Sequence, residues 1–212
     1  TKKPMIISTG MANLDEITEV VDVARDNGCE DLVLLHCISS YPAPPEQSNL
    51  RTIPDLREHF GVLVGLSDHT MGTTVAISSV ALGASVIEKH FTLSRNDKGP
   101  DSTFSLEPHE LKELCEETKT AYLSLGIAGY ELKDAEKSVL SFRRSLYAVK
   151  DIQKGEKFTK ENIRSIRPGL GLPPKYYEKI LGNNASEDIK YSSPLSWDNV
   201  NLSADETINN LK

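Results

Sequence analysis

A chain of 212 residues, 38% of them hydrophobic, is long enough for one or two globular domains with real cores. No apolar run approaches the roughly 20 residues of a membrane-spanning helix, so no membrane span is expected. The formal charge of -7 comes without a basic cluster. This argues against nucleic-acid binding, because neutralising phosphates needs concentrated lysine and arginine.

Residues 4–125 alternate strand and helix four times, which is typical of βα units around a parallel sheet. The expected strands cover residues 4–8, 32–38, 62–67 and 85–91, and the expected helices cover 13–27, 73–82 and 107–124. Four such units make half of an eight-stranded TIM-type (β/α) barrel, and an isolated half leaves two open parallel edges. We therefore expect residues 1–125 to be the C-terminal half of a barrel whose first half is missing.

The composition changes after residue 125. We expect a linker over 126–140 that includes a polar helix near 132–140, followed by a small, loop-rich β domain over 141–201. In that domain the pattern predicts a strand over 142–149 and a helix start, capped by a threonine, over 159–162. A polar tail follows over 202–212.

Three cysteines, Cys29, Cys37 and Cys115, are widely spaced and form no CxxC pair. An odd number at such spacings fits reduced thiols packed in a cytoplasmic protein rather than a disulfide framework.

Two histidine motifs about twenty residues apart, at 65–70 and 88–92, each close an expected strand. Side chains alternate faces along a strand. Ser67 and His69 therefore share one face, as do Glu88 and His90, while Asp68 and Lys89 point the other way. Two histidines at the ends of neighbouring strands can share one metal ion; alternatively, each is a hydrogen-bonded strand-end residue without a ligand.

Five segments in this order resemble the sialic acid (nonulosonic acid) synthase family: residues 6–12, 36–42, 65–70, 88–92 and 99–101. Residues 142–149 and 165–169 resemble the C-terminal antifreeze-like (SAF) domain of the same enzymes. Four further segments look most like the pseudaminic acid synthase branch: residues 88–95, 101–108, 143–147 and 194–198.

The resemblance implies condensation of phosphoenolpyruvate and water with an N-acylated amino sugar, which gives a nonulosonic acid and phosphate. In the pseudaminate branch the sugar is 2,4-diacetamido-2,4,6-trideoxy-L-altrose. His69 and His90 match the family's protein ligands for a divalent metal, and two imidazoles completed by oxygen ligands suit Mn²⁺, or else Mg²⁺, better than structural zinc. Asp101 and Tyr41 match positions near the sugar; on residues alone, Asp101 could equally be a turn residue.

The resemblance also assigns Ser8, Ser39 and Ser67 to the phosphoenolpyruvate pocket, although the N-acetylneuraminate branch usually has asparagine at position 39. Phe142 matches an apolar contact to the N-acyl group. Arg167 matches an arginine that reaches from the SAF domain into the barrel of the partner in a domain-swapped homodimer; the alternative is a surface arginine in a turn.

The family's basic phosphate-binding residues from the first barrel half are not in this chain, so the fragment alone is expected to be inactive. Three alternatives remain open. The protein could be an N-acetylneuraminate or legionaminate synthase, another phosphoenolpyruvate-using aldol synthase on the same barrel, or a non-catalytic binding module. Barrels host many chemistries, so the motifs and not the fold carry the functional prediction.

Overall fold

The computed structural model describes residues 3–201 and divides into two compact units, residues 1–128 and 129–212. The expected polar tail at 202–212 lies outside the described residues. Within residues 3–201, no helix is both long enough and apolar enough to cross a membrane.

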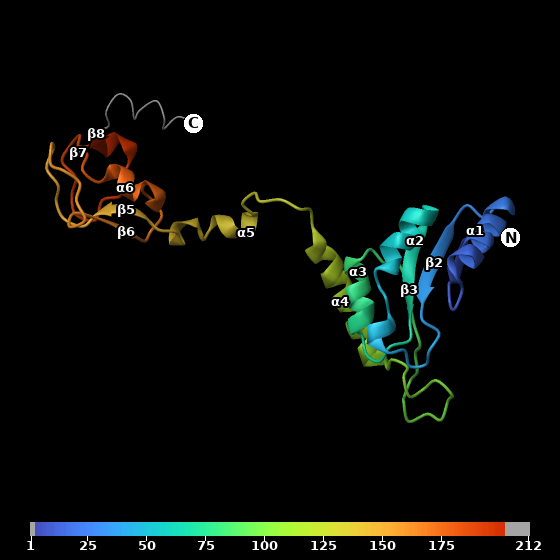
Figure 1. Cartoon of the computed structure of the whole chain (residues 1–212). Coiled ribbons are helices and arrows are strands. Elements are labelled where there is room, and N and C mark those ends of the chain that lie inside the picture. The colour runs from blue at the N-terminus through green and yellow to red at the C-terminus, as the bar shows by residue number, and fades with distance from the viewer. Residues whose placement is uncertain (1–2, 202–212) are drawn as a thin grey trace. The chain divides into compact units, whose positions relative to one another are not determined.

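The first unit is built on one four-stranded parallel sheet (Figure 1). The strands lie in chain order, which is the order of a TIM-type barrel, whereas a doubly wound sheet reverses its order partway. They are β1 (Met5–Ser8), β2 (Leu32–Cys37), β3 (Leu63–Asp68) and β4 (Ile87–Lys89). This confirms the predicted α/β fold with half of a barrel.

The helices of this unit lie between and after the strands: α1 (Leu14–Asp26), α2 (Thr52–Phe60), α3 (Thr74–Ala81) and α4 (Pro108–Leu125). Helices α2 and α3 both pack against β3 (Figure 1). A single-turn 3-10 helix, Pro45–Gln47, precedes α2.

The sheet has one face turned to the helices. Leu34 and Val64 from the strands join Val21 of α1 and Leu56 of α2 in one buried core. Residues of opposite parity, such as Ile6 and Leu63, are each 58% exposed. Alternation along the strands therefore separates a helix-covered face from the face that would line the inside of a barrel.

Helix-capping residues explain where α1 begins and where α2 ends. Asn13 and Glu16 form a reciprocal capping box at the start of α1. Gly61 takes a left-handed conformation at the end of α2, where φ is +62°.

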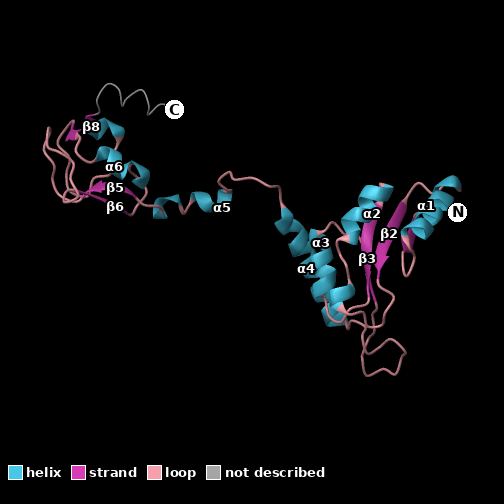
Figure 2. Ribbon diagram, viewed as in Figure 1, coloured by secondary structure: helices cyan, strands magenta, loops and turns pink. Residues whose placement is uncertain are grey.

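The second unit is a loop-rich β domain with little helix (Figure 2). Two antiparallel pairs form it, β5 (Ser145–Ala148) with β6 (Ile163–Ile166) and β7 (Asn184–Ala185) with β8 (Val200–Asn201). The short helices are α5 (Asp134–Lys137) and α6 (Tyr177–Ile180), with 3-10 turns at Leu140–Phe142, Pro174–Tyr176 and Trp197–Asn199.

The structure differs from the sequence prediction in the following details. Residues 159–162 form a turn rather than a helix start, because the strand β6 begins at once at Ile163. The strand predicted from residue 142 begins at Ser145. The helix predicted near 132–140 is limited to Asp134–Lys137. Cys115 is exposed and Cys29 is half-buried, so only Cys37 is packed as expected.

Candidate metal and substrate site

The two histidines of the predicted site lie together beyond the ends of adjacent strands. His69 directly follows β3 and His90 directly follows β4. Their ring centroids are 5.2 Å apart and the ring planes make an angle of 63°. His69 is buried, whereas the His90 side chain is 31% exposed. The structure therefore brings the two expected ligands to one place.

Hydrogen bonding leaves one nitrogen of His69 for a ligand. Its Nδ1 lies 2.9 Å from the carbonyl oxygen of Ile38. A carbonyl can only accept, so Nδ1 donates its proton there, and in the neutral imidazole Nε2 then has the lone pair. A backbone partner of this kind fixes both the tautomer and the ring orientation, as is usual for metal-bound histidines.

Two further aromatic rings enclose the pair. Tyr41 lies 4.2 Å from the His69 ring and 5.6 Å from the His90 ring, measured between centroids. Phe104 lies 5.1 Å from His90 and 5.9 Å from Tyr41. Tyr41, predicted near the sugar, is therefore at the site and remains half exposed. Phe104 was not predicted; the only sequence signal was a lone aromatic residue in a polar loop.

Asp101 approaches His90 from the long loop between β4 and α4, with 3.5 Å between the carboxylate Oδ2 and Nδ1. The base of this loop is closed by backbone hydrogen bonds from Leu106 to His90 and from Thr92 to Leu106. Inside the loop, the Ser105 hydroxyl donates to the Asp101 carbonyl at 2.7 Å. Asp101 is thus held beside His90 by its own loop.

The three serines expected to bind phosphoenolpyruvate lie in different surroundings. The Ser67 hydroxyl donates to the carboxylate of Glu88 at 2.8 Å, which confirms that these two residues share a face. Glu88 was not among the predicted site residues, although its parity with His90 was a usable signal. Ser39 lies 3.8 Å from the Cys37 sulfur, and Ser8 is exposed at the end of β1.

Asp68 and Lys89 lie on the opposite face, as their parity predicted. They form a buried ion pair with 2.8 Å between the Lys89 Nζ and the Asp68 Oδ2. Lys89 also donates to the Thr70 carbonyl at 2.6 Å.

The histidine pair fits a divalent ion. Two imidazoles bound in adjacent positions, with metal–nitrogen bonds of about 2.1 Å, place their ring centroids roughly 4.5 to 5.5 Å apart. The 5.2 Å separation falls in this range, and the Nδ1 atoms of both rings face other partners. The separation of the two rings is therefore compatible with both imidazoles binding one ion.

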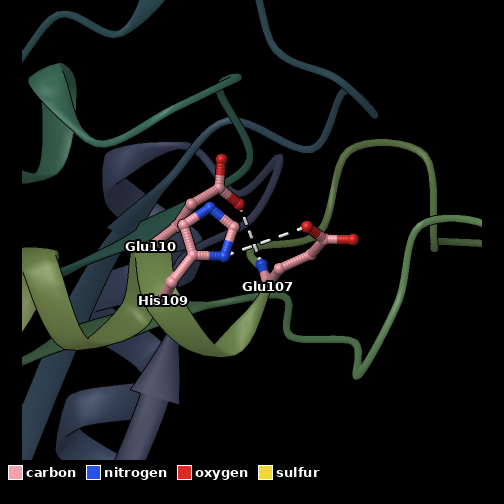
Figure 3. A group of neighbouring side chains, drawn as sticks. All are labelled: Glu107, His109 and Glu110. Carbon is pink, nitrogen blue, oxygen red and sulfur yellow. Dashed lines mark hydrogen bonds and ion pairs between the residues drawn. The ribbon is translucent and has the colours of Figure 1, made fainter.

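A second group of possible ligands, Glu107, His109 and Glu110, lies at the start of α4 (Figure 3). Its carboxylates already have partners. Glu110 accepts from Arg95 and from the Glu107 backbone, and Glu107 accepts from the Arg95 backbone at 2.8 Å. The Arg95 hydrogen bond, then that of Glu107, lowers the pKa of Glu110 below its usual value. The group is thus a helix cap that anchors Arg95.

Phe142 and Arg167 belong to the second unit. Phe142 ends the 3-10 turn before β5 and is 64% exposed, and Arg167 follows β6. Their predicted contacts with a barrel lie outside what the structure of the second unit tests.

Together, the fold and the site define a class: half of a TIM-type barrel with a two-histidine site at the strand ends, joined to a small β domain. Comparison with known protein families identifies the family of each part of the chain. The profile of the NeuB family matches residues 1–129, and that of the SAF domain matches residues 143–201. The chain belongs to the NeuB family and carries a SAF domain, which confirms the resemblance to the sialic acid synthase family.

Individual relatives agree with this assignment. The chain is 44% identical to pseudaminic acid synthase from Campylobacter jejuni over 92% of its length and 57% of the relative's. It is also 44% identical to N,N'-diacetyllegionaminic acid synthase from the same species, over 89% of this chain and 57% of that protein. The chain thus spans little more than half the length of these relatives.

A solved structure shares the fold of the chain. The spore coat polysaccharide biosynthesis protein SpsE of Bacillus subtilis superposes with a TM-score of 0.57 and 34% sequence identity. The match covers 95% of this chain and 62% of that one.

Proposed function

We propose that this chain is the metal-binding and sugar-facing part of a nonulosonic acid synthase, and specifically of a pseudaminic acid synthase. The reaction condenses phosphoenolpyruvate and water with 2,4-diacetamido-2,4,6-trideoxy-L-altrose and releases phosphate. The observation that carries the proposal is the convergence of His69, His90, Tyr41 and Asp101 in the unit that matches the NeuB family.

In this proposal, His69 and His90 hold Mn²⁺ or Mg²⁺ through Nε2. When bound, such an ion polarises the aldehyde oxygen of the open-chain sugar. Tyr41 and Phe104 form an apolar wall beside the histidines that limits water and orients the sugar. Asp101 lies next to His90 with a half-exposed carboxylate, where it can accept a hydrogen bond from a sugar hydroxyl.

Hydroxyls of Ser8, Ser39 and Ser67 are proposed donors to phosphoenolpyruvate. Hydroxyls alone offset the desolvation of a multiply charged anion poorly. We therefore assign full activity to a protein that also contains the part of the relatives that this chain does not span.

For the second unit, we propose that Phe142 and Arg167 reach the barrel of a partner in a domain-swapped homodimer. A planar guanidinium suits contact with a sugar's carbonyl and hydroxyl oxygens. The three free cysteines support a cytoplasmic location for the enzyme.

The choice of sugar needs a direct test, because the pseudaminic and legionaminic acid synthases of Campylobacter jejuni are equally similar to this chain. The test measures phosphate release from phosphoenolpyruvate by the full-length protein with Mn²⁺. One reaction contains the diacetamido-trideoxy-altrose, one contains the legionaminate precursor sugar and one contains N-acetylmannosamine.

We expect release only with the first sugar, reduced at least about a hundredfold in His90→Ala and unchanged in His59→Ala, whose histidine is exposed on α2. Release only with another sugar would move the protein to that branch. No release with any of them would contradict the synthase proposal and favour a binding module.

A further inference from the structure

The buried ion pair between Asp68 and Lys89 has no role in the proposed chemistry, since it lies on the helix-covered face of the sheet. Their side chains are 1% and 3% exposed, respectively. Each residue directly precedes one of the two site histidines in the sequence. The pair therefore joins the two strands at the position nearest to both rings.

The backbone ladder beside the two rings is short, and the Ile38 carbonyl orients the His69 ring from outside this ladder. Strands β3 and β4 pair over only three residues, and Asp68 opposite Lys89 is the last of these pairs. Beyond it, the Asp68 carboxylate accepts from the Thr70 backbone N–H at 2.9 Å while Lys89 donates to the Thr70 carbonyl. Lys89 thus ties β4 to the residues on both sides of His69.

Stability alone is a poor explanation for such a pair. Burying two charges costs most of what their attraction gains, and well-packed apolar residues often replace a buried pair without loss. A buried pair does, however, fix the geometry of the elements that carry it. We propose that Asp68 and Lys89 are positioning residues that set the separation of the His69 and His90 rings. The consequence of this positioning for metal binding rests on the proposed function.

The test compares variants of the 212-residue chain. Removing one partner leaves the other charge buried and unpaired, which risks unfolding. The informative variant is therefore the neutral pair Asp68→Asn/Lys89→Met. Val64→Ala is the matched control. Val64 is fully buried on the same face of β3, at the opposite end of the strand from His69. Its truncation lowers stability away from the two rings.

The first readout needs no metal: nuclear Overhauser effects between the ring protons of His69 and His90. The second is the affinity for Mn²⁺. We expect the neutral pair to remain folded, to lose the ring–ring effects and to bind Mn²⁺ at least about tenfold more weakly. The Val64→Ala control should keep both.

A neutral pair with wild-type ring–ring effects would overturn the positioning role. If the wild-type chain bound no Mn²⁺, the metal proposal would fail, and the ring–ring effects would still decide the positioning role.

Discussion

Gly65 is a single residue on which the close approach of β3 and β4, the two strands that precede the site histidines, depends. A Cβ at this position would lie 2.2 Å from the Val86 carbonyl oxygen and 2.7 Å from the Leu35 Cδ2. The same carbonyl oxygen accepts the Leu66 backbone N–H at 2.9 Å. Only a residue without a side chain lets β3 lie this close to the start of β4.

We therefore expect Gly65→Ala to lower the free energy of unfolding by about 1–3 kcal/mol or more, because the clash is with backbone. Urea unfolding of the 212-residue chain measures the change. Gly28→Ala is the control: nothing lies within 4 Å of the new Cβ, but φ is +82°, so only a backbone cost of about 1–2 kcal/mol is expected, without a steric clash. If Gly65→Ala were as stable as the wild type, β3 and β4 would be able to move apart without a cost in stability.

At the scale of elements, Arg95 fastens the loop that carries Asp101 and Phe104. Its backbone N–H and guanidinium bind Glu107 and Glu110 at the start of α4, and its Nε donates to the Ser105 carbonyl at 3.1 Å. The loop is thereby attached to a helix end as well as to β4.

This attachment predicts a pH dependence. The pKa of Glu110 in the folded chain is lowered from 4.5, chiefly by Arg95. The contribution of the ionised Glu110 carboxylate to the free energy of unfolding is therefore fully present above pH 4.5. It is lost as the pH falls through the lower pKa of the folded chain. We expect Glu110→Gln to lower stability by about 0.2–1 kcal/mol at pH 7, with the difference from wild type shrinking below pH 4.5.

Thermal unfolding between pH 3 and 7 measures this difference. Glu113→Gln, a change to an exposed glutamate on the same helix, serves as the comparison. An effect of Glu110→Gln that stayed constant down to pH 3 would contradict the role of the ionised pair.

The elements also show what the sequence could and could not predict. Period-two alternation predicted the faces of Ser67 and Lys89, because a strand leaves a side chain only two directions. Helix α2 was not predicted, since its three buried residues, Ile53, Leu56 and Phe60, are diluted by charged neighbours. For Glu88, alternation gave the face but not the partner, because its bond to Ser67 depends on the register of the two strands. The contacts of Phe104 depend on closure of its loop, and no local pattern encodes that.

At the scale of the whole molecule, each unit has its own core. The core of the second unit is drawn entirely from residues 146–200, and Leu146 at its centre is 0% exposed. Two separate unfolding transitions are therefore expected by calorimetry. Leu146→Ala should destabilise one transition by about 2–5 kcal/mol and leave the other unchanged. A shift of both would show that the units unfold as one.

We propose that the half-barrel carries a metal site made by His69 and His90. The most direct measurement is a Mn²⁺ titration of the 212-residue chain followed by electron paramagnetic resonance, with His90→Ala and His109→Ala alongside. We predict one bound ion per chain, lost in His90→Ala and kept in His109→Ala, whose histidine belongs to the group at the start of α4. Binding that survives the loss of His90, or that disappears with His109, would show that the ion is not held by His69 and His90.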